Sequence, residues 1–210
     1  MVNRYVMIRA DGTEVENPTI TGLKVNFFGD GNLVKIAEGS VFHGCTVNIS
    51  NESTLIIHRT HPVGLKYVTF AMAGQSWRNY VEIGENFSVA YTTRFALENT
   101  DDARVMIGRN NMWSSEIVIR ASDGHQIIDI ATNQVINQAK SIIIGDHVWL
   151  GSQAVILKGA VIPDNTIVGQ SAVVAGQFTE TFTVLAGNSA RVVRRGVTWN
   201  RKYVIESQLP

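Results

Sequence analysis

The stretch from Ile144 to Val174 reads IGDHVWLGSQAVILKGAVIPDNTIVGQSAVV, and it divides into blocks of six residues. Each block begins with an aliphatic residue: Ile144, Leu150, Ile156, Ile162, Val168 and Val174. A period of six fits neither an α-helix nor a strand whose side chains alternate between two faces. It is typical of a chain that turns a corner after every block, so that three blocks complete one triangular coil.

Residues eighteen apart should therefore stack in successive coils, with Ile144 against Ile162 inside the prism. The other expected pairs are Leu150 with Val168 and Ile156 with Val174. Backbone hydrogen bonds would join neighbouring coils as a parallel sheet, so each coil depends on the next one for its partners. Glycine, asparagine and aspartate belong at the corners, where the backbone needs unusual angles.

Shorter runs of the same spacing occur earlier in the chain. They are Ile36, Phe42 and a block at Asn48, then Ile83 and Val89, then Ile107, Trp113 and Ile119. The sequence thus predicts a single all-β domain over 1–210, a parallel β-helix. We expect irregular N-terminal coils over 1–82, main coils over 83–176, and a C-terminal tail or short helix over 177–210.

The repeat is interrupted once in an informative place. Ile119 and Ile144 are 25 residues apart, one more than four blocks would give. The segment 120–141 should therefore leave the prism as an excursion loop and return to it. Loops that a rigid scaffold positions often carry function, and this one contains His125.

Composition limits the function further. Eighteen Lys and Arg balance eighteen Asp and Glu, and this argues against a nucleic-acid binder. A single cysteine, Cys45, excludes an intrachain disulfide and favours a cytoplasmic protein. The N-terminus does not read as a signal peptide, and no apolar run is long enough for a membrane span. No His/Cys/Asp cluster has metal-ligand spacing, so we expect no catalytic metal.

Several motifs resemble those of one enzyme family. The repeat quoted above, SDGH at Ser122–His125, AGNSARVV at Ala186–Val193 and VTWNRK at Val197–Lys202 occur in the same order in hexapeptide-repeat acyltransferases. Within that family the stretch from Trp113 to Lys202 is most similar to bacterial polysaccharide O-acetyltransferases, including those acting on sialic acid capsules. The resemblance implies a left-handed helix, acetyl-CoA as cosubstrate, a sugar hydroxyl as acceptor, and a homotrimer with active sites between subunits.

The resemblance also implies that His125 is the general base, because the family places a histidine in a loop shortly before its I-G-x-x-V-W-x-G block. A histidine, with a pKa of about 6.5, is mostly neutral at pH 7 and able to accept the hydroxyl proton. An acidic neighbour could orient its ring. Glu116, Asp123 and Asp129 are the local candidates, and spacing does not choose among them.

Trp149 directly precedes an inward position and should face outward near a corner. By resemblance it lines the active site beside the histidine, and the alternative is a packing role at a subunit interface. The family's oxyanion donor is a backbone N–H just after this tryptophan, and Gly151 and Ser152 match that position. A backbone donor suits the task because it is fixed before the reaction begins.

Coenzyme A carries several phosphates and an adenine. The segment 191–202 contains five basic residues and no acidic one, a local field of the right sign. AGNSARVV is similar to the family's closing G-N-P-A-K/R-V motif, with Ser189 where proline is usual. The candidates for coenzyme binding are Gly151, Ser152, Lys158, Gly187, Arg191, Arg194, Trp199 and Lys202, with Trp199 as a stacking partner for adenine. The alternatives are a solvated basic tail and, for Lys158, an ordinary corner lysine.

Two other functions compete with sugar O-acetylation. One is N-acetylation of a nucleotide-linked amino sugar on the same fold, although no added nucleotide-binding domain is evident. The other is a non-catalytic β-helix that binds ice, carbohydrate or a protein partner. Threonines do not recur at eighteen-residue spacing, which disfavours ice binding. Ala175 stands where some sialic-acid relatives have an aromatic side chain, so the sequence does not identify the acceptor sugar.

Overall fold

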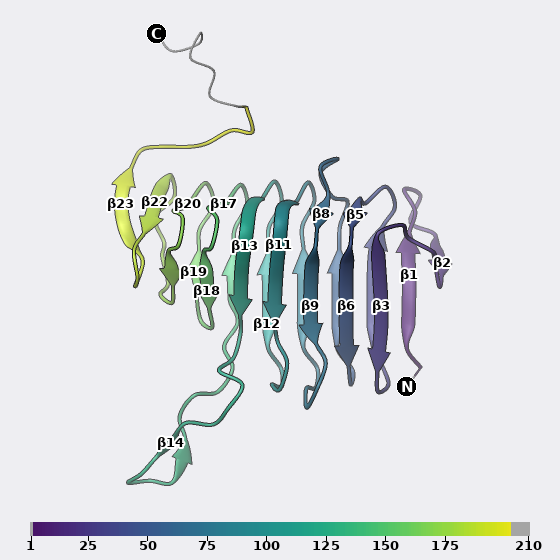
Figure 1. Cartoon of the computed structure of the whole chain (residues 1–210), viewed down its shortest axis with the longest axis horizontal. Helices are drawn as coiled ribbons and strands as arrows, with labels where there is room; N and C mark the ends of the chain where they lie inside the picture. The colour runs from purple at the N-terminus through teal and green to yellow at the C-terminus, as the bar shows by residue number, and fades with distance from the viewer. Residues whose placement is uncertain (1, 203–210) are drawn as a thin grey trace.

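The computed structural model describes residues 2–202 and is built of strands and turns. In Figure 1 the coils follow one another along the long axis, from β1 at the N-terminal end to β23 at the other. The predicted all-β parallel helix is confirmed. The tail after the last regular coil is a hairpin and an extended segment, since residues 2–202 contain no helix and therefore none able to cross a membrane.

The strands form two long sheets and a small hairpin. The eight-stranded sheet contains β1 (Arg4–Ile8), β2 (Glu14–Glu16), β4 (Leu33–Ala37), β7 (Thr54–Ile57), β10 (Tyr80–Ile83), β12 (Arg104–Ile107), β16 (Ile142–Ile144) and β19 (Val161–Ile162). The thirteen-stranded sheet contains β3 (Leu23–Phe28), β5 (Phe42–His43), β6 (Cys45–Ser50), β8 (Leu65–Lys66), β9 (Val68–Met72), β11 (Ser88–Ala96), β13 (Met112–Arg120), β17 (Trp149–Leu150), β18 (Val155–Leu157), β20 (Ile167–Val168), β21 (Val173–Val174), β22 (Thr183–Ala186) and β23 (Arg191–Arg195). The hairpin pairs β14 (Ile128–Asp129) with β15 (Gln134–Val135).

The expected stacking of hexad positions is confirmed in the C-terminal coils. Ile144 pairs with Ile162, and both are buried. The other two pairs, Leu150 with Val168 and Ile156 with Val174, hold the same register. The inward side chains form one continuous apolar column, because each aliphatic residue packs on its equivalents in the coils above and below.

The block expected at Asn48 is wrong by one residue. Val47 and Ile49 are buried, whereas Asn48 points outward and accepts a hydrogen bond from Asn26. The N-terminal coils are longer than eighteen residues, with 21 to 29 residues between paired positions. The extra residues sit at corners, so a strict six-residue count loses its register there.

Each regular coil has three corners, which we define on the coil of residues 144–160. The first corner is 145–147, the second is 151–153 and the third is 158–160, each with its equivalents in other coils. Left-handed backbone marks them: φ is 56° at His147, 63° at Gln153 and 80° at Gly159. Strand β13 bends at the second corner, since Met112 pairs with β17 and Arg120 pairs with β18.

Glycines stack at the first corner where the coils approach most closely. A Cβ on Gly108 would lie 2.7 Å from the carbonyl carbon of Gly145, and one on Gly145 would lie 2.7 Å from the Asp164 nitrogen. We expect Gly145→Ala to lower the free energy of unfolding by about 1–3 kcal/mol, because backbone must move to admit the methyl group. Urea denaturation would measure this. Gly176→Ala is the control, since its Cβ would meet only the Phe178 ring at 3.8 Å and the free energy should barely change.

The segment 197–202, which we call the strap, runs back along the first corner toward the N-terminal coils. Trp199 stacks on His147 with ring centroids 4.2 Å apart and donates its indole N–H to the His147 carbonyl at 2.9 Å. Arg201 donates to the carbonyls of Asn86 and Asn111 and to the hydroxyl of Ser88. Burial lowers the pKa of the Arg201 guanidinium, and these three neutral acceptors satisfy it. The strap therefore joins coils that are far apart in sequence.

Candidate functional site

The predicted excursion is present, with His125 near its base. The chain leaves the prism after β13 ends at Arg120, forms the β14–β15 hairpin and returns at Ile142. Figure 1 shows this hairpin projecting away from the helix. The His125 side chain is exposed, and its ring forms no hydrogen bond with another described residue. A base that must meet a substrate needs such a free ring.

Three residues, which we call the anchor, fasten the excursion to the third corner. Lys158 Nζ donates to Asp123 Oδ2 at 2.5 Å and to the Asn137 carbonyl at 2.9 Å. Asn137 Nδ2 donates to Asp123 Oδ2 and to the His125 carbonyl, both at 2.8 Å. The Lys158 and Asn137 hydrogen bonds hold the pKa of the Asp123 carboxyl below its usual range. The anchor thus fixes the backbone at His125, a role for Asn137 that sequence spacing did not reveal.

None of the three candidate acids hydrogen-bonds the His125 ring in the described chain. Asp123 is paired with Lys158, and Asp129 accepts hydrogen bonds from Thr132 within the excursion. Glu116 lies at the second corner, where Gln153 Nε2 donates to it at 2.9 Å. Asp123 therefore positions the loop rather than the ring. Lys158 serves the same anchor, so its ammonium is not a free phosphate ligand.

Breaking the anchor should loosen the excursion while leaving the prism folded. We expect Lys158→Met to speed hydrogen exchange across 121–141, because the Asp123 carboxylate loses its cation. The Asp123 pKa is lowered in the folded state, so its pairing stabilises the loop above pH ~4 and is lost as pH falls through that lowered pKa. Exchange read by mass spectrometry at pH 7 and below pH 4 tests this. Lys140→Met is the control, because Lys140 forms no ion pair among the described residues. Equal protection in both variants would contradict the anchor.

Trp149 and Ser152 lie together at a different place on the coil. Trp149 is half-buried and faces outward from β17, and its Nε1 donates to Ser114 Oγ at 3.2 Å. The Gly151 N–H donates to the Val168 carbonyl, so it is not available to an oxyanion. A Cβ on Gly151 would lie 2.7 Å from Gln170 N, which explains the glycine. The Ser152 N–H has no acceptor among the described residues. Of the two expected oxyanion donors, only the Ser152 N–H is therefore free to donate.

One chain does not bring these two groups together. Ser152 lies at the second corner and His125 beyond the third, with strand β18 between the two corners. The two cavities that His125 lines have volumes of about 150 and 130 Å³. Sites that enclose a small organic ligand usually have about 300 Å³ or more. Within one chain, His125 and Ser152 therefore lie apart, and neither cavity lined by His125 reaches that volume.

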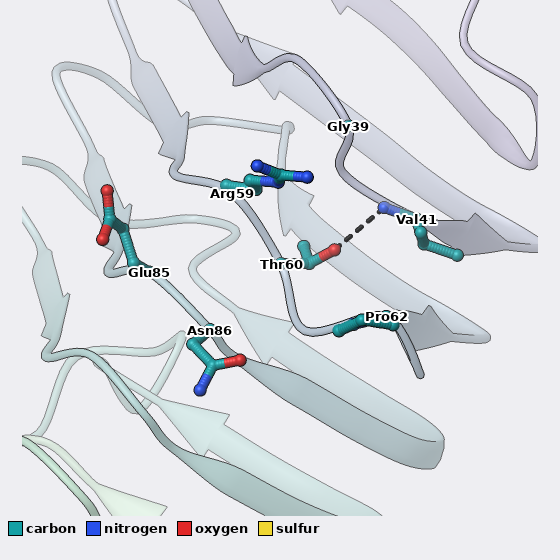
Figure 2. Close-up of a pocket in the computed structure, with 7 residues that line it drawn as sticks. All are labelled: Gly39, Val41, Arg59, Thr60, Pro62, Glu85 and Asn86. Atoms are coloured by element: carbon teal, nitrogen blue, oxygen red, sulfur yellow. Dashed lines mark hydrogen bonds between the residues drawn. The ribbon is translucent and has the colours of Figure 1, made fainter. Parts of the chain in front are cut away.

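A larger cavity lies elsewhere. It has a volume of about 580 Å³ and lies at the first corner of N-terminal coils, lined by Arg59, Glu85 and Asn86 among others (Figure 2). In Figure 2 the Thr60 hydroxyl, which accepts a hydrogen bond from the Val41 N–H, closes one side. None of the predicted catalytic residues lines it.

The predicted coenzyme residues divide into two groups. Gly187, Arg191 and Arg194 belong to the β22–β23 hairpin on the last coil, where both arginines are exposed and form no ion pair among the described residues. Trp199 is only 7% exposed, with His147 against its ring, so it is not available to stack on adenine. Lys202 is exposed at the end of the strap.

The chain also contains a free cysteine and side chains of the types that ligate metals. Cys45 is buried, and burial raises the pKa of its thiol, which disfavours the nucleophilic thiolate. Within residues 2–202, no three His, Cys, Asp or Glu side chains are grouped as metal ligands would be.

Comparison with known proteins finds sequence similarity to polysialic acid O-acetyltransferases. No protein-family model matches the sequence. It is 35% identical over 102 residues to a polysialic acid O-acetyltransferase of Escherichia coli O1:K1, a match covering 49% of this chain and 33% of that protein. It is 38% identical over 102 residues to the polysialic acid O-acetyltransferase of Neisseria meningitidis, covering 49% of this chain and 47% of that protein. The matched stretch thus spans a third to a half of these relatives.

The fold comparison covers much more of the chain. The crystal structure of the polySia specific acetyltransferase NeuO superposes with a TM-score of 0.70 and 26% identity, over 88% of this chain and 92% of that one. The chain therefore has the left-handed β-helix fold of this acetyltransferase and is similar in sequence to polysialic acid O-acetyltransferases over 102 residues.

Proposed function

We propose that the protein is an acetyl-CoA-dependent O-acetyltransferase that modifies a hydroxyl of a bacterial surface polysaccharide, such as capsule or O-antigen, or of its precursor. The observation that carries the proposal is an exposed histidine, His125, whose backbone the anchor holds and which by sequence resemblance matches the family's base. The names of the relatives support the acceptor class. Because acetyl-CoA is made in the cytoplasm, the proposal places the reaction there.

The proposed reaction needs no covalent enzyme intermediate. A ring nitrogen of His125 takes the proton of the sugar hydroxyl as the hydroxyl oxygen attacks the thioester carbonyl. The Ser152 N–H donates to the oxyanion that forms. When the tetrahedral intermediate collapses, the carbon–sulfur bond breaks and the imidazolium returns the proton to the leaving thiolate. The products are the sugar acetate and free coenzyme A. Arg191 and Arg194 would bind the phosphates of the coenzyme.

Two copies of the chain would complete the site, in a homotrimer with His125 of one copy facing Trp149 and Ser152 of its neighbour. The separation of His125 from Ser152 within one chain supports this arrangement. Exposed isoleucines on the excursion support it too: Ile127, Ile128, Ile130 and Ile136 are 48–100% exposed. Apolar side chains gathered on one projecting hairpin usually mark an interface. Sedimentation would give the oligomeric state.

A mixing experiment tests the shared site directly. His125→Ala removes the base and Ser152→Pro removes the proposed backbone donor, so each variant alone should release no thiol from acetyl-CoA with a panel of capsular and O-antigen glycans. When the two are unfolded together and refolded, some interfaces join an intact His125 to an intact Ser152, and activity should return. Separately refolded proteins, mixed afterwards, are the control. A co-refolded mixture that stays inactive would contradict the shared site, and turnover only with amino-sugar nucleotides would favour N-acetylation.

A further inference from the structure

Two tyrosines lie exposed on the second corner of the N-terminal coils, outside the site described above. Tyr67 is 51% and Tyr91 is 53% exposed, and their ring centroids are 4.8 Å apart at an angle of 59°. Isolated apolar side chains on a surface are ordinary, but two exposed aromatic rings in contact, which we call the platform, gather aromatic surface at one place.

The backbone at Tyr67 is unusual for a bulky residue. Its φ of 53° lies in the left-handed region, as φ does at the equivalent second-corner residues Thr92, Glu116, Gln153 and Ser171. The ring lies over Gly44, where a Cβ would come within 2.9 Å of Tyr67 Cδ1. The left-handed backbone is thus a property of this corner, and what distinguishes Tyr67 is the exposed aromatic ring that it holds over a glycine.

The platform is in line with the proposed oxyanion donor. Tyr91 pairs with Ser115, and the Ser115 carbonyl accepts a hydrogen bond from the Gln153 N–H, next to Ser152. Strands in neighbouring coils are about 4.8 Å apart, so the two tyrosines lie on the order of 10 and 14 Å from Ser152 along the helix axis. Between the tyrosines and Ser152 the corner carries Ser114 and Ser115, beside Glu116, to which Gln153 Nε2 donates a hydrogen bond.

The proposed sites for the glycan acceptor and for the acetyl donor lie on opposite sides of Ser152 along the helix axis. The free arginines of the last coil, Arg191 and Arg194, lie C-terminal to Ser152, whereas the platform lies on its N-terminal side. A glycan lying along the second corner would therefore extend over the tyrosines without crossing the coenzyme.

We propose that Tyr67 and Tyr91 form a second sugar subsite, which binds a pyranose ring one or two units from the one that is acetylated. This rests on the proposed function and specifies its acceptor as an oligosaccharide or polymer rather than a monosaccharide. The C–H face of a pyranose packs on an aromatic ring, and tyrosine supplies that surface at small entropic cost while its hydroxyl bonds the ring substituents.

Lys66 gives the subsite a preference for acidic sugars. It directly precedes Tyr67, is partly exposed and forms no ion pair within residues 2–202. A carboxylate on the bound sugar would pair with its ammonium, and added salt would weaken that pairing.

The test compares acceptors of graded length. Oligosialic acids and galacto-oligosaccharides of one to six residues are the probes, and thiol release from acetyl-CoA gives kcat and KM for each. Tyr67→Ala and Tyr91→Ala should each raise KM for the longer oligomers by about tenfold, the loss expected for one stacked aromatic, with kcat unchanged. Turnover of the monosaccharide should not change. Tyr67→Phe and Tyr91→Phe keep the ring and should retain most of the affinity.

Phe28→Ala is the matched control, because Phe28 is 52% exposed but lies at the end of β3, away from this corner. Lys66→Ala should remove the preference for sialic over neutral oligomers. Glycan binding is also measured by calorimetry on the His125→Ala protein, which needs no turnover. Length-dependent binding without catalysis would support the subsite and overturn the proposed reaction. Oligomer KM and calorimetric affinity that are the same in the tyrosine variants and the wild type would overturn the subsite alone.

Discussion

Replacement of His125 by alanine is expected to lower kcat/KM for acetyl transfer by about 10²- to 10⁴-fold, the usual contribution of a general base. The proton of the sugar hydroxyl would then have no acceptor in the site, while the Ser152 N–H and the coenzyme contacts would remain. Acceptor KM should change little, because the loss falls on the chemical step. Thiol release with a glycan acceptor measures it.

The fold should tolerate this substitution. The His125 side chain is exposed. The hydrogen bond that holds this residue runs from Asn137 Nδ2 to its backbone carbonyl, which alanine retains. The melting temperature should stay close to that of the wild type. Gln126→Ala is the matched control, since it changes the next exposed residue of the same loop and should keep full activity. Full activity of His125→Ala would rule out the proposed mechanism.

The C-terminal coils could be predicted well from the sequence because the same requirement, burial of one aliphatic side chain, applies to each block. The residue that starts a hexad must be buried, and Ile144 on Ile162 shows that eighteen-residue spacing then determines the register. The N-terminal coils obey the same force, but extra residues at their corners shift the count, as at Asn48. Hydrophobic periodicity reports which residues face inward and not how many residues a corner contains.

The site was less predictable because it depends on contacts between distant segments. Glu116 is near His125 in sequence, but Glu116 lies at the second corner, where β13 bends, and the rest of β13 carries the chain away to the third corner. Asn137 approaches Asp123 only because the excursion folds back as a hairpin. In the sequence, Trp199 lies among the basic residues of the tail. In the structure, however, the strap packs it against His147, 52 residues away. None of these contacts follows from a repeat.

Replacement of Trp113 by alanine should cost about 3–5 kcal/mol of unfolding free energy, the range for truncating a buried tryptophan. Trp113 is fully buried, stacks on Phe95 with centroids 5.8 Å apart and meets the edge of Phe87 at 4.8 Å. It pairs with Val89 in one neighbouring coil and Leu150 in the other, so the vacated space would weaken the contacts of both. Urea denaturation followed by circular dichroism measures the change.

Trp113→Phe separates ring packing from the rest of the side chain. The indole Nε1 of Trp113 is buried without an acceptor among the described residues, and an unsatisfied donor of this kind costs about 1–3 kcal/mol. Phenylalanine removes that donor and keeps an aromatic ring, so its loss should be far smaller than that of alanine. Trp77→Ala, at a tryptophan that is 42% exposed, should also cost less. A free energy of unfolding for Trp113→Ala within about 1 kcal/mol of the wild-type value would contradict this prediction. It would mean that packing between coils is not what stabilises β13, the strand that leads to His125.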